Sequence, residues 1–355
     1  MQNTPAKRNY ALDAIKVVAT IAILFHHHQQ VSGAVFTNHP NFWGSAHFNW
    51  ALMVELFFMI SGFFAYRSLL ECKEPFGPYI GKKAGRLLPT AAVSACAYFA
   101  LSSLYYFLNG KPWYFKYVPD FFGLIVTCLG LQRGFGFDGS KINYPAWFIS
   151  VLLICYACFY LLAKLCKKKS WRLEWVMLLA VIITQNLHQR INTLPFFNSE
   201  ALRGYQAFPL GVLIASFISS YRINKPIVGL CIASVASSAA FIIFAPAFID
   251  SSAAFIFLIA PALIILAQTE TAQKLFRHSF WSHLSAISFN TYVWQSTLQV
   301  LLGLIAPGIV FSQTVGGMYL FTLLAWIVGA LSHYLIERPL AKYLPQFWNC
   351  IFVRK

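Results

Sequence analysis

The sequence predicts an all-helical bundle that crosses a membrane about ten times. Of its 355 residues, 58% are hydrophobic and only 11% are charged, whereas soluble domains carry about 25% charged residues. The hydrophobic residues form continuous runs, most of them close to the ~20 residues that an α-helix needs to cross a bilayer. Continuous runs favour helices over a membrane β-barrel, in which apolar and polar residues alternate along each strand.

Eleven apolar segments are candidates for these spans. They cover residues 10–30, 49–68, 89–108, 121–132, 145–163, 173–188, 203–220, 226–245, 251–268, 284–305 and 316–336. The fourth segment is too short, because a helix of that length reaches about 18 Å across a hydrocarbon core of roughly 30 Å. We therefore expect residues 109–144 to form one external region with a re-entrant or interfacial piece, and the other ten segments to cross.

The positions of Lys and Arg predict the orientation, because short cytoplasmic loops collect these residues. Twenty of the 27 fall in the expected inner loops and tails, six in the expected outer ones, and Lys16 inside a span. Both termini are then cytoplasmic, and we expect one integral-membrane domain over residues 1–355. This orientation also accounts for the net charge of +16, so we expect no nucleic-acid partner.

The first span carries Lys16 near its start and a histidine cluster, His26–His28, at its far end. Ionisable groups are costly inside a bilayer, so each is a candidate functional residue. Lys16 and His27 share one helical face, about 16 Å apart along the axis. Because neutral imidazole suits proton abstraction from a hydroxyl, we predict His27 as a general base. The alternatives are a histidine-rich interfacial turn, or a metal site completed by His39 and His47.

Glu55 lies in the outer third of the second span, ahead of the small pair Ser61-Gly62. A carboxylate at that depth needs a partner. A histidine at the outer end of the first span is at matching depth, so we expect Glu55 to orient it. The alternative is a hydrogen bond between helices that has no role in chemistry. Ser61-Gly62 fits close helix packing equally well.

Further polar side chains lie close to or inside other spans. The third span is preceded by Lys82, Lys83 and Arg86. These cations either set the orientation of the chain and contact lipid headgroups, or they bind the phosphates of a phosphorylated donor. Trp147 opens the segment after the external region, where an interfacial anchor is common. Asn290 and Gln295 place amides inside an apolar span, which predicts a polar cavity.

Taken together, five stretches resemble the acyltransferase-3 family of bacterial integral-membrane acyltransferases. In chain order they are Leu12-Asp13-Ala-Ile-Lys16 followed by His27, Phe57-Phe58-Met-Ile-Ser61-Gly62-Phe63, Lys83-Ala-Gly-Arg86-Leu-Leu-Pro89, Ser285-Ala-Ile-Ser288-Phe-Asn-Thr-Tyr292, and Ile336-Glu337-Arg338-Pro339. They extend over nearly the whole chain, in the family's order. Three positions depart from the family pattern: Lys16 replaces a usual Arg, Gln295 a frequent His, and no Glu follows Trp147 closely.

The resemblance implies a stand-alone member, without an appended hydrolase-like domain, in a bacterial cytoplasmic membrane. It implies transfer of an acyl group, commonly acetyl from cytoplasmic acetyl-CoA or another acyl-CoA, to a hydroxyl of a cell-envelope carbohydrate or glycan. No metal or permanently bound cofactor is implied, and the lipid bilayer is the remaining partner. The sequence does not fix the oligomeric state.

The same resemblance implies roles for the candidate residues. His27 deprotonates the acceptor, Glu55 orients His27, and Lys16 stabilises negative charge or holds the pantetheine arm. The cations expected to bind the CoA are Lys82, Lys83 and Arg86, and the residues expected on the substrate path are Ser61, Trp147, Asn290 and Gln295. Two alternatives stay open, a transporter or flippase for a glycan or small metabolite, and a non-catalytic membrane partner protein.

Overall fold

The computed structural model describes residues 8–36, 48–70, 74–113, 117–138, 141–188, 190–191 and 193–342. The chain is 82% helical, which confirms the predicted class. Within the described residues, strands occur only in one antiparallel hairpin, formed by β1 (Thr193–Leu194) and β2 (Phe197–Asn198). Seven described helices are long and apolar enough to cross a membrane.

Each of the ten predicted spans contains a helix. Nine are continuous: α1 (Tyr10–Ser32), α2 (Met53–Leu70), α3 (Phe76–Asn109), α5 (Trp147–Lys169), α6 (Leu173–His188), α7 (Ser199–Ser220), α8 (Lys225–Phe244), α12 (Ser279–Ile305) and α14 (Val315–Ser332). The tenth is built from α9 (Ser251–Ala254), the π-helical turn η5 (Phe255–Ile259) and α10 (Ala260–Leu266). Short helices lie between them: α4 (Phe121–Cys128), α11 (Glu270–Leu275) and α13 (Pro307–Val310). Single helical turns complete the set: η1 (Trp50–Leu52), η2 (Arg133–Phe135), η3 (Tyr144–Ala146), η4 (Pro246–Phe248) and η6 (His333–Glu337).

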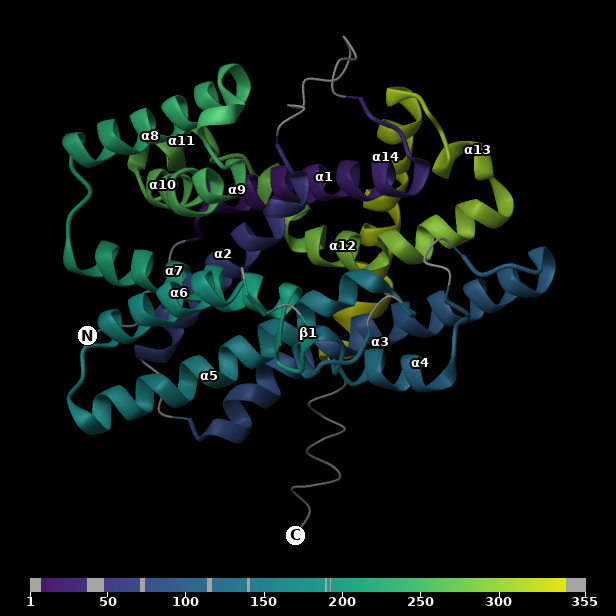
Figure 1. Cartoon of the computed structure of the whole chain (residues 1–355), viewed down its shortest axis with the longest axis horizontal. Helices are drawn as coiled ribbons and strands as arrows, with labels where there is room; N and C mark the ends of the chain where they lie inside the picture. Colours follow the sequence, from purple (N-terminus) through teal and green to yellow (C-terminus); the bar gives the residue numbers. More distant parts are fainter. Residues whose placement is uncertain are drawn as a thin grey trace.

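The helix α1 lies inside the bundle and packs against α2, α12 and α14. Figure 1 shows α1, in purple, beside the yellow-green α12, although the two are far apart in the sequence. We call the end of the bundle where α1 and α3 begin and α5 ends the basic end, and the opposite end the histidine end. The basic end lies toward the left of Figure 1, and α13 is at the histidine end.

The short segment predicted to remain outside the bilayer core forms α4, which packs on α3. Its eight residues reach about 12 Å as a helix, too little to cross. The chain then turns back, and the buried Gln132 amide donates to Thr127 Oγ1 at 2.6 Å and to the Ile142 carbonyl at 2.9 Å. These bonds satisfy polar groups that water does not reach.

Asp120→Ala is expected to loosen α4. The Asp120 carboxylate caps the helix at the Gly123 N–H (2.5 Å) and accepts from Lys141 Nζ (2.7 Å). The hydrogen bond from Lys141 holds the pKa of Asp120 below its ordinary 3.8. The cap is therefore complete at neutral pH and is lost only as the pH falls below that value. Losing such a cap costs about 1 kcal/mol.

Amide hydrogen exchange over residues 121–128 measures this effect. We expect faster exchange in Asp120→Ala and a smaller change in Asp120→Asn, because the Asn side-chain oxygen also caps a helix. Equal exchange rates in Asp120→Ala and the wild type would show that this carboxylate does not hold α4 in place.

The third helix begins well before the apolar segment predicted for it. The sequence places a loop up to residue 88, whereas α3 is helical from Phe76. Tertiary packing explains the difference, because the buried Tyr79 ring lies 5.0 Å from the Tyr160 ring of α5. The basic cluster is consequently displayed on a helix, which fixes the directions of its side chains relative to one another.

The helices α2 and α7 cross in close contact through two glycines. A Cβ atom added at Gly62 would lie 2.1 Å from the Phe208 carbonyl oxygen, and one at Gly211 would lie 1.8 Å from that of Met59. Small residues permit this close approach of two helix backbones. Gly62 therefore serves close helix packing, as one interpretation of the Ser61-Gly62 pair predicted. The crossing also sets the position of the first turns of α2 and α7.

Candidate functional site

A buried ion pair joins α2 to α7 at the histidine end. Arg203 donates from Nε to Glu55 Oε1 (2.6 Å) and from Nη2 to Glu55 Oε2 (2.8 Å). The Glu55 side chain is 2% exposed and that of Arg203 is 22% exposed. Arg203 Nη2 also donates to the Ala51 carbonyl at 2.8 Å, and the guanidinium lies 5.4 Å from the centre of the Trp147 ring. The planar fork matches both carboxylate oxygens, which is the geometry that makes a buried pair tolerable.

Glu55 therefore meets a different partner from the one predicted. The sequence suggests that it orients a histidine, but both of its oxygens accept from Arg203. The contact is instead a pair of hydrogen bonds between two helices, which was the alternative considered for Glu55. The interpretation from sequence also missed Arg203, which it placed only as an outer cation. One feature of the sequence could have indicated this ion pair. Glu55 lies inside the second predicted span at about the same depth as Arg203, which is at the outer edge of another span.

The three histidines of α1 have different surroundings. His28 is fully buried, its Nε2 lies 3.2 Å from the Ile309 carbonyl, and its ring packs on Phe321. His26 stacks at a tilt on His27, with ring centres 5.4 Å apart. His28 thus holds α13 against α1.

The His27 ring lies against the side-chain amide of Gln295 on α12. The two groups do not meet hydrogen-bond geometry. Within the described residues, His27 Nδ1 and both polar atoms of Gln295 are buried without a hydrogen-bond partner. Such groups cost about 1–3 kcal/mol each when unsatisfied, so they mark a place where a ligand can bind. Arg203 is close enough for its charge to act on the His27 ring.

We refer to His27, Gln295, Glu55, Arg203 and Trp147 as the histidine-end cluster. They come from α1, α12, α2, α7 and α5, so the site exists only when these helices are assembled. The structure thus brings together four residues predicted from the sequence and adds Arg203. The cluster combines a neutral imidazole and amide with a charge-balanced ion pair.

A second group of polar residues gathers around Tyr156 at the basic end. Lys83 Nζ lies 4.7 Å from the centre of the Tyr156 ring, and the Ser61 hydroxyl lies against the tyrosine hydroxyl. The charge of Arg86 acts on both Tyr156 and Lys16. We refer to Lys16, Ser61, Lys83, Arg86 and Tyr156 as the basic-end cluster.

Lys16 is anchored within this cluster. Its Nζ lies 3.7 Å from Asp13 Oδ1 and 5.2 Å from the centre of the Phe64 ring. Asp13 also accepts from Arg8 Nε at 2.7 Å and from the Ser285 hydroxyl at 2.7 Å, which ties α1 to the start of α12. The acidic residue of the Leu12-Asp13 motif therefore fixes the cation that follows it.

Two of the predicted site residues lie elsewhere. The exposed Lys82 pairs with Glu74 and is not part of the basic-end cluster. Asn290 donates to Glu337 Oε2 (2.6 Å) and accepts from the Ser332 hydroxyl (2.8 Å), and His333 Nδ1 lies 2.5 Å from the same Glu337 oxygen. This network joins α12 to η6, so the structure gives Asn290 a place in helix packing.

No group of three or more His, Cys, Asp or Glu side chains able to hold a metal ion occurs within the residues that the structure describes. His39 and His47, named as possible ligands, fall outside the described residues.

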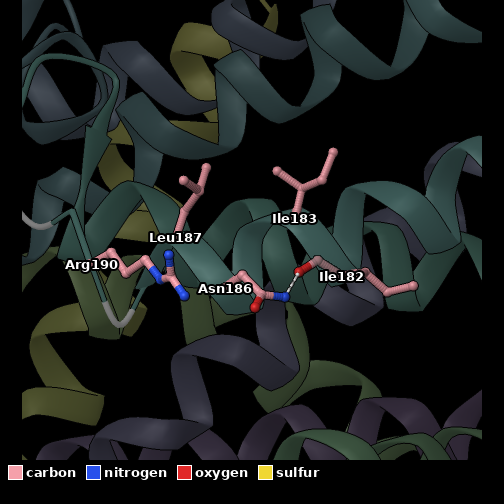
Figure 2. A pocket seen from close by; sticks show the side chains of 5 residues that line it. All are labelled: Ile182, Ile183, Asn186, Leu187 and Arg190. Atoms are coloured by element: carbon pink, nitrogen blue, oxygen red, sulfur yellow. Dashed lines mark hydrogen bonds between the residues drawn. The ribbon is translucent and has the colours of Figure 1, made fainter.

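A hollow of about 350 Å³ lies on the outward face of α6 and contains none of the predicted residues. It is lined by Ile182, Ile183, Asn186, Leu187 and Arg190 (Figure 2). The figure shows the Asn186 amide turned back onto the Ile182 carbonyl, with which it forms a hydrogen bond of 2.8 Å. An exposed, mainly aliphatic face on a membrane helix suits lipid chains, so we do not assign the chemistry to it.

The chain was compared with known protein families, curated proteins and solved structures. The model of the acyltransferase-3 family, described as an acyltransferase domain, matches residues 9–335, a range that includes every residue of both clusters. No curated protein and no solved structure matched the chain. Because the matched range covers nearly the whole sequence, the chain belongs to the acyltransferase-3 family of membrane acyltransferases.

Proposed function

We propose that this acyltransferase moves an acetyl group from cytoplasmic acetyl-CoA to a hydroxyl of a cell-envelope carbohydrate. The observation that carries the proposal is that one helix, α1, links the two polar clusters. Lys16 belongs to the basic-end cluster and His27 to the histidine-end cluster. The two residues are about 16 Å apart along the helix axis. A donor at one end and an acceptor at the other are thus connected through the protein interior.

The basic-end cluster suits a CoA donor. CoA carries several phosphate charges, and the basic-end cluster holds three cations: Lys83 and Arg86 act on Tyr156, and the charge of Arg86 also acts on Lys16. Lysine and arginine bind phosphate through charge-assisted hydrogen bonds. We assign the nucleotide to Lys83 and Arg86, with the flexible thioester arm directed along α1 past Lys16 and Ser61.

The histidine-end cluster suits an uncharged hydroxyl acceptor. The Glu55–Arg203 pair is charge-balanced and Gln295 is a neutral amide, so neither offers the excess positive charge that a phosphate or carboxylate acceptor needs. His27 takes the proton of the acceptor hydroxyl as the oxygen attacks the thioester carbonyl carbon. The new C–O bond replaces the C–S bond, and His27 passes the proton of the acceptor hydroxyl to the departing thiolate.

The charge distribution supports an orientation with the basic end in the cytoplasm of a bacterial cell. The start of α3 and the end of α5 meet at that end, and short cytoplasmic segments collect Lys and Arg. The cations there are Lys82, Lys83, Arg86, Lys167, Lys168 and Lys169. Acetyl-CoA and the envelope carbohydrate are then each on the side of the membrane where cells keep them.

Inside-out membrane vesicles test the proposal. Acetyl-CoA carrying a radiolabelled acetyl group is added outside, where the cytoplasmic face is exposed. We expect label in carbohydrate inside the vesicles only when the protein is present. Carbohydrate movement across the membrane without consumption of acetyl-CoA would instead support a transporter and overturn the proposal.

Lys83→Met is expected to raise the KM for acetyl-CoA about tenfold with little change in kcat, because it removes one charged contact to the donor. Initial rates at varied acetyl-CoA measure both constants. Lys82→Met is the matched control, since its ammonium pairs with Glu74 on an exposed surface. Equal KM values for the two variants would remove Lys83 from the donor site.

A further inference from the structure

Arg203 retains one unused hydrogen-bonding edge. Its Nε and Nη2 atoms are occupied by Glu55 and Ala51. Among the residues described, none forms a hydrogen bond with Nη1. The Arg203 side chain as a whole is 22% exposed. A guanidinium has five N–H donors, and the two on Nη1 are the ones available to a ligand.

The guanidinium is held in one position before any ligand arrives. It donates hydrogen bonds to Glu55 on α2 and to the Ala51 carbonyl in η1, and the Trp147 ring of α5 lies against it. Its charge reaches the rings of His26 and His27 on α1. A donor fixed in a low-dielectric site stabilises developing negative charge without reorganising during the reaction. The paired carboxylate limits its attraction for anions, while its N–H groups still bind a single oxygen.

We propose that Arg203 is a catalytic residue that binds the oxygen of the acyl carbonyl and stabilises the oxyanion of the tetrahedral intermediate. This inference rests on the proposed function. When the acceptor oxygen bonds to the carbonyl carbon, the carbonyl π electrons move onto the carbonyl oxygen, and Arg203 Nη1 donates to it. The oxyanion then collapses, the C–S bond breaks, and the thiolate accepts from His27 the proton that came from the acceptor hydroxyl. Glu55 is the positioning residue for Arg203.

The test uses detergent-solubilised protein, labelled acetyl-CoA, and carbohydrate extracted from cells that lack the protein. In Arg203→Met, kcat should fall about 100- to 1000-fold while the KM for acetyl-CoA stays within about threefold. Arg203→Lys should be intermediate, because an ammonium keeps the charge without the fork. The half-buried Lys141, whose partner is Asp120, lies outside both clusters, so Lys141→Met is the control and should retain the wild-type kcat.

A buried Glu55 left alone can unfold Arg203→Met, so a double variant separates folding from chemistry. Glu55→Gln/Arg203→Met should regain the wild-type melting temperature and remain inactive. Guanidinium chloride at concentrations that do not unfold the protein should restore part of the activity of Arg203→Ala, while sodium chloride at equal ionic strength should not.

Three results would overturn the role of Arg203: wild-type kcat in the double variant, a change in KM alone, or rescue by sodium chloride. The proposed function fails in a different way. In that case the wild type itself transfers no label from acetyl-CoA, and the Arg203 variants need not be compared.

Discussion

His27→Ala is expected to abolish acyl transfer while the protein stays folded and inserted. A positioned base accelerates a reaction about 100- to 10,000-fold, and His27 is the histidine that lies against Gln295 with its Nδ1 unpaired. Within the described residues the Nδ1 of His27 has no hydrogen-bond partner, so stability should change little. Transfer of labelled acetyl groups and the melting temperature of purified protein measure the two effects.

The adjacent histidines serve as controls for this variant. His26→Ala should keep most of the activity, because Gln295 acts on the ring of His27 and is not among the groups that act on the ring of His26. His28→Ala should lower the melting temperature instead, since His28 is fully buried against Phe321 and contacts the Ile309 carbonyl. Activity of His27→Ala equal to that of His26→Ala would show that His27 is not the base.

Gly211→Ala is expected to force α2 and α7 apart. The added Cβ would lie 1.8 Å from the Met59 carbonyl oxygen, and a backbone atom inside a helix cannot move aside as a side chain can. Overpacking of this kind costs about 1–3 kcal/mol or more. Arg203 is on one of these helices and Glu55 on the other, so activity should fall together with stability. Melting temperature and acyl transfer are measured on the same preparation.

Gly229→Ala is the matched control, because Gly229 is also within a helix, α8, and an added Cβ would meet nothing within 4 Å. Alanine is favoured over glycine in a helix by about 1 kcal/mol, so this variant should be as stable as the wild type or slightly more stable. Similar melting temperatures for Gly211→Ala and Gly229→Ala would contradict the close crossing of α2 and α7.

Hydropathy and segment length predict the helices of this fold because the bilayer imposes both. A spanning segment must satisfy its own backbone and cover the hydrocarbon core, so the ten long helical segments and the short α4 are visible in the sequence. The early start of α3 cannot be predicted from the sequence, because helix formation ahead of Pro89 depends on the packing of Tyr79 on Tyr160. That contact comes from tertiary structure, which a single-segment pattern does not contain.

The candidate site was predictable where it depends on one helix. The spacing along α1 selects His27 together with Lys16, and family motifs select Ser61 and Lys83. The partner of Glu55 was not predictable, because Arg203 lies 148 residues away and reaches it only through the crossing of α2 and α7. The same limit applies to Lys82 and Lys83, which are adjacent in sequence but contact different partners.

The most direct test of the central claim is the mass of the envelope carbohydrate from cells with and without this protein. We predict a species heavier by one acetyl group that disappears when the gene is deleted. The species should return with the wild-type protein and stay absent with His27→Ala. Identical carbohydrate masses with and without the protein, or full restoration by His27→Ala, would contradict the central claim.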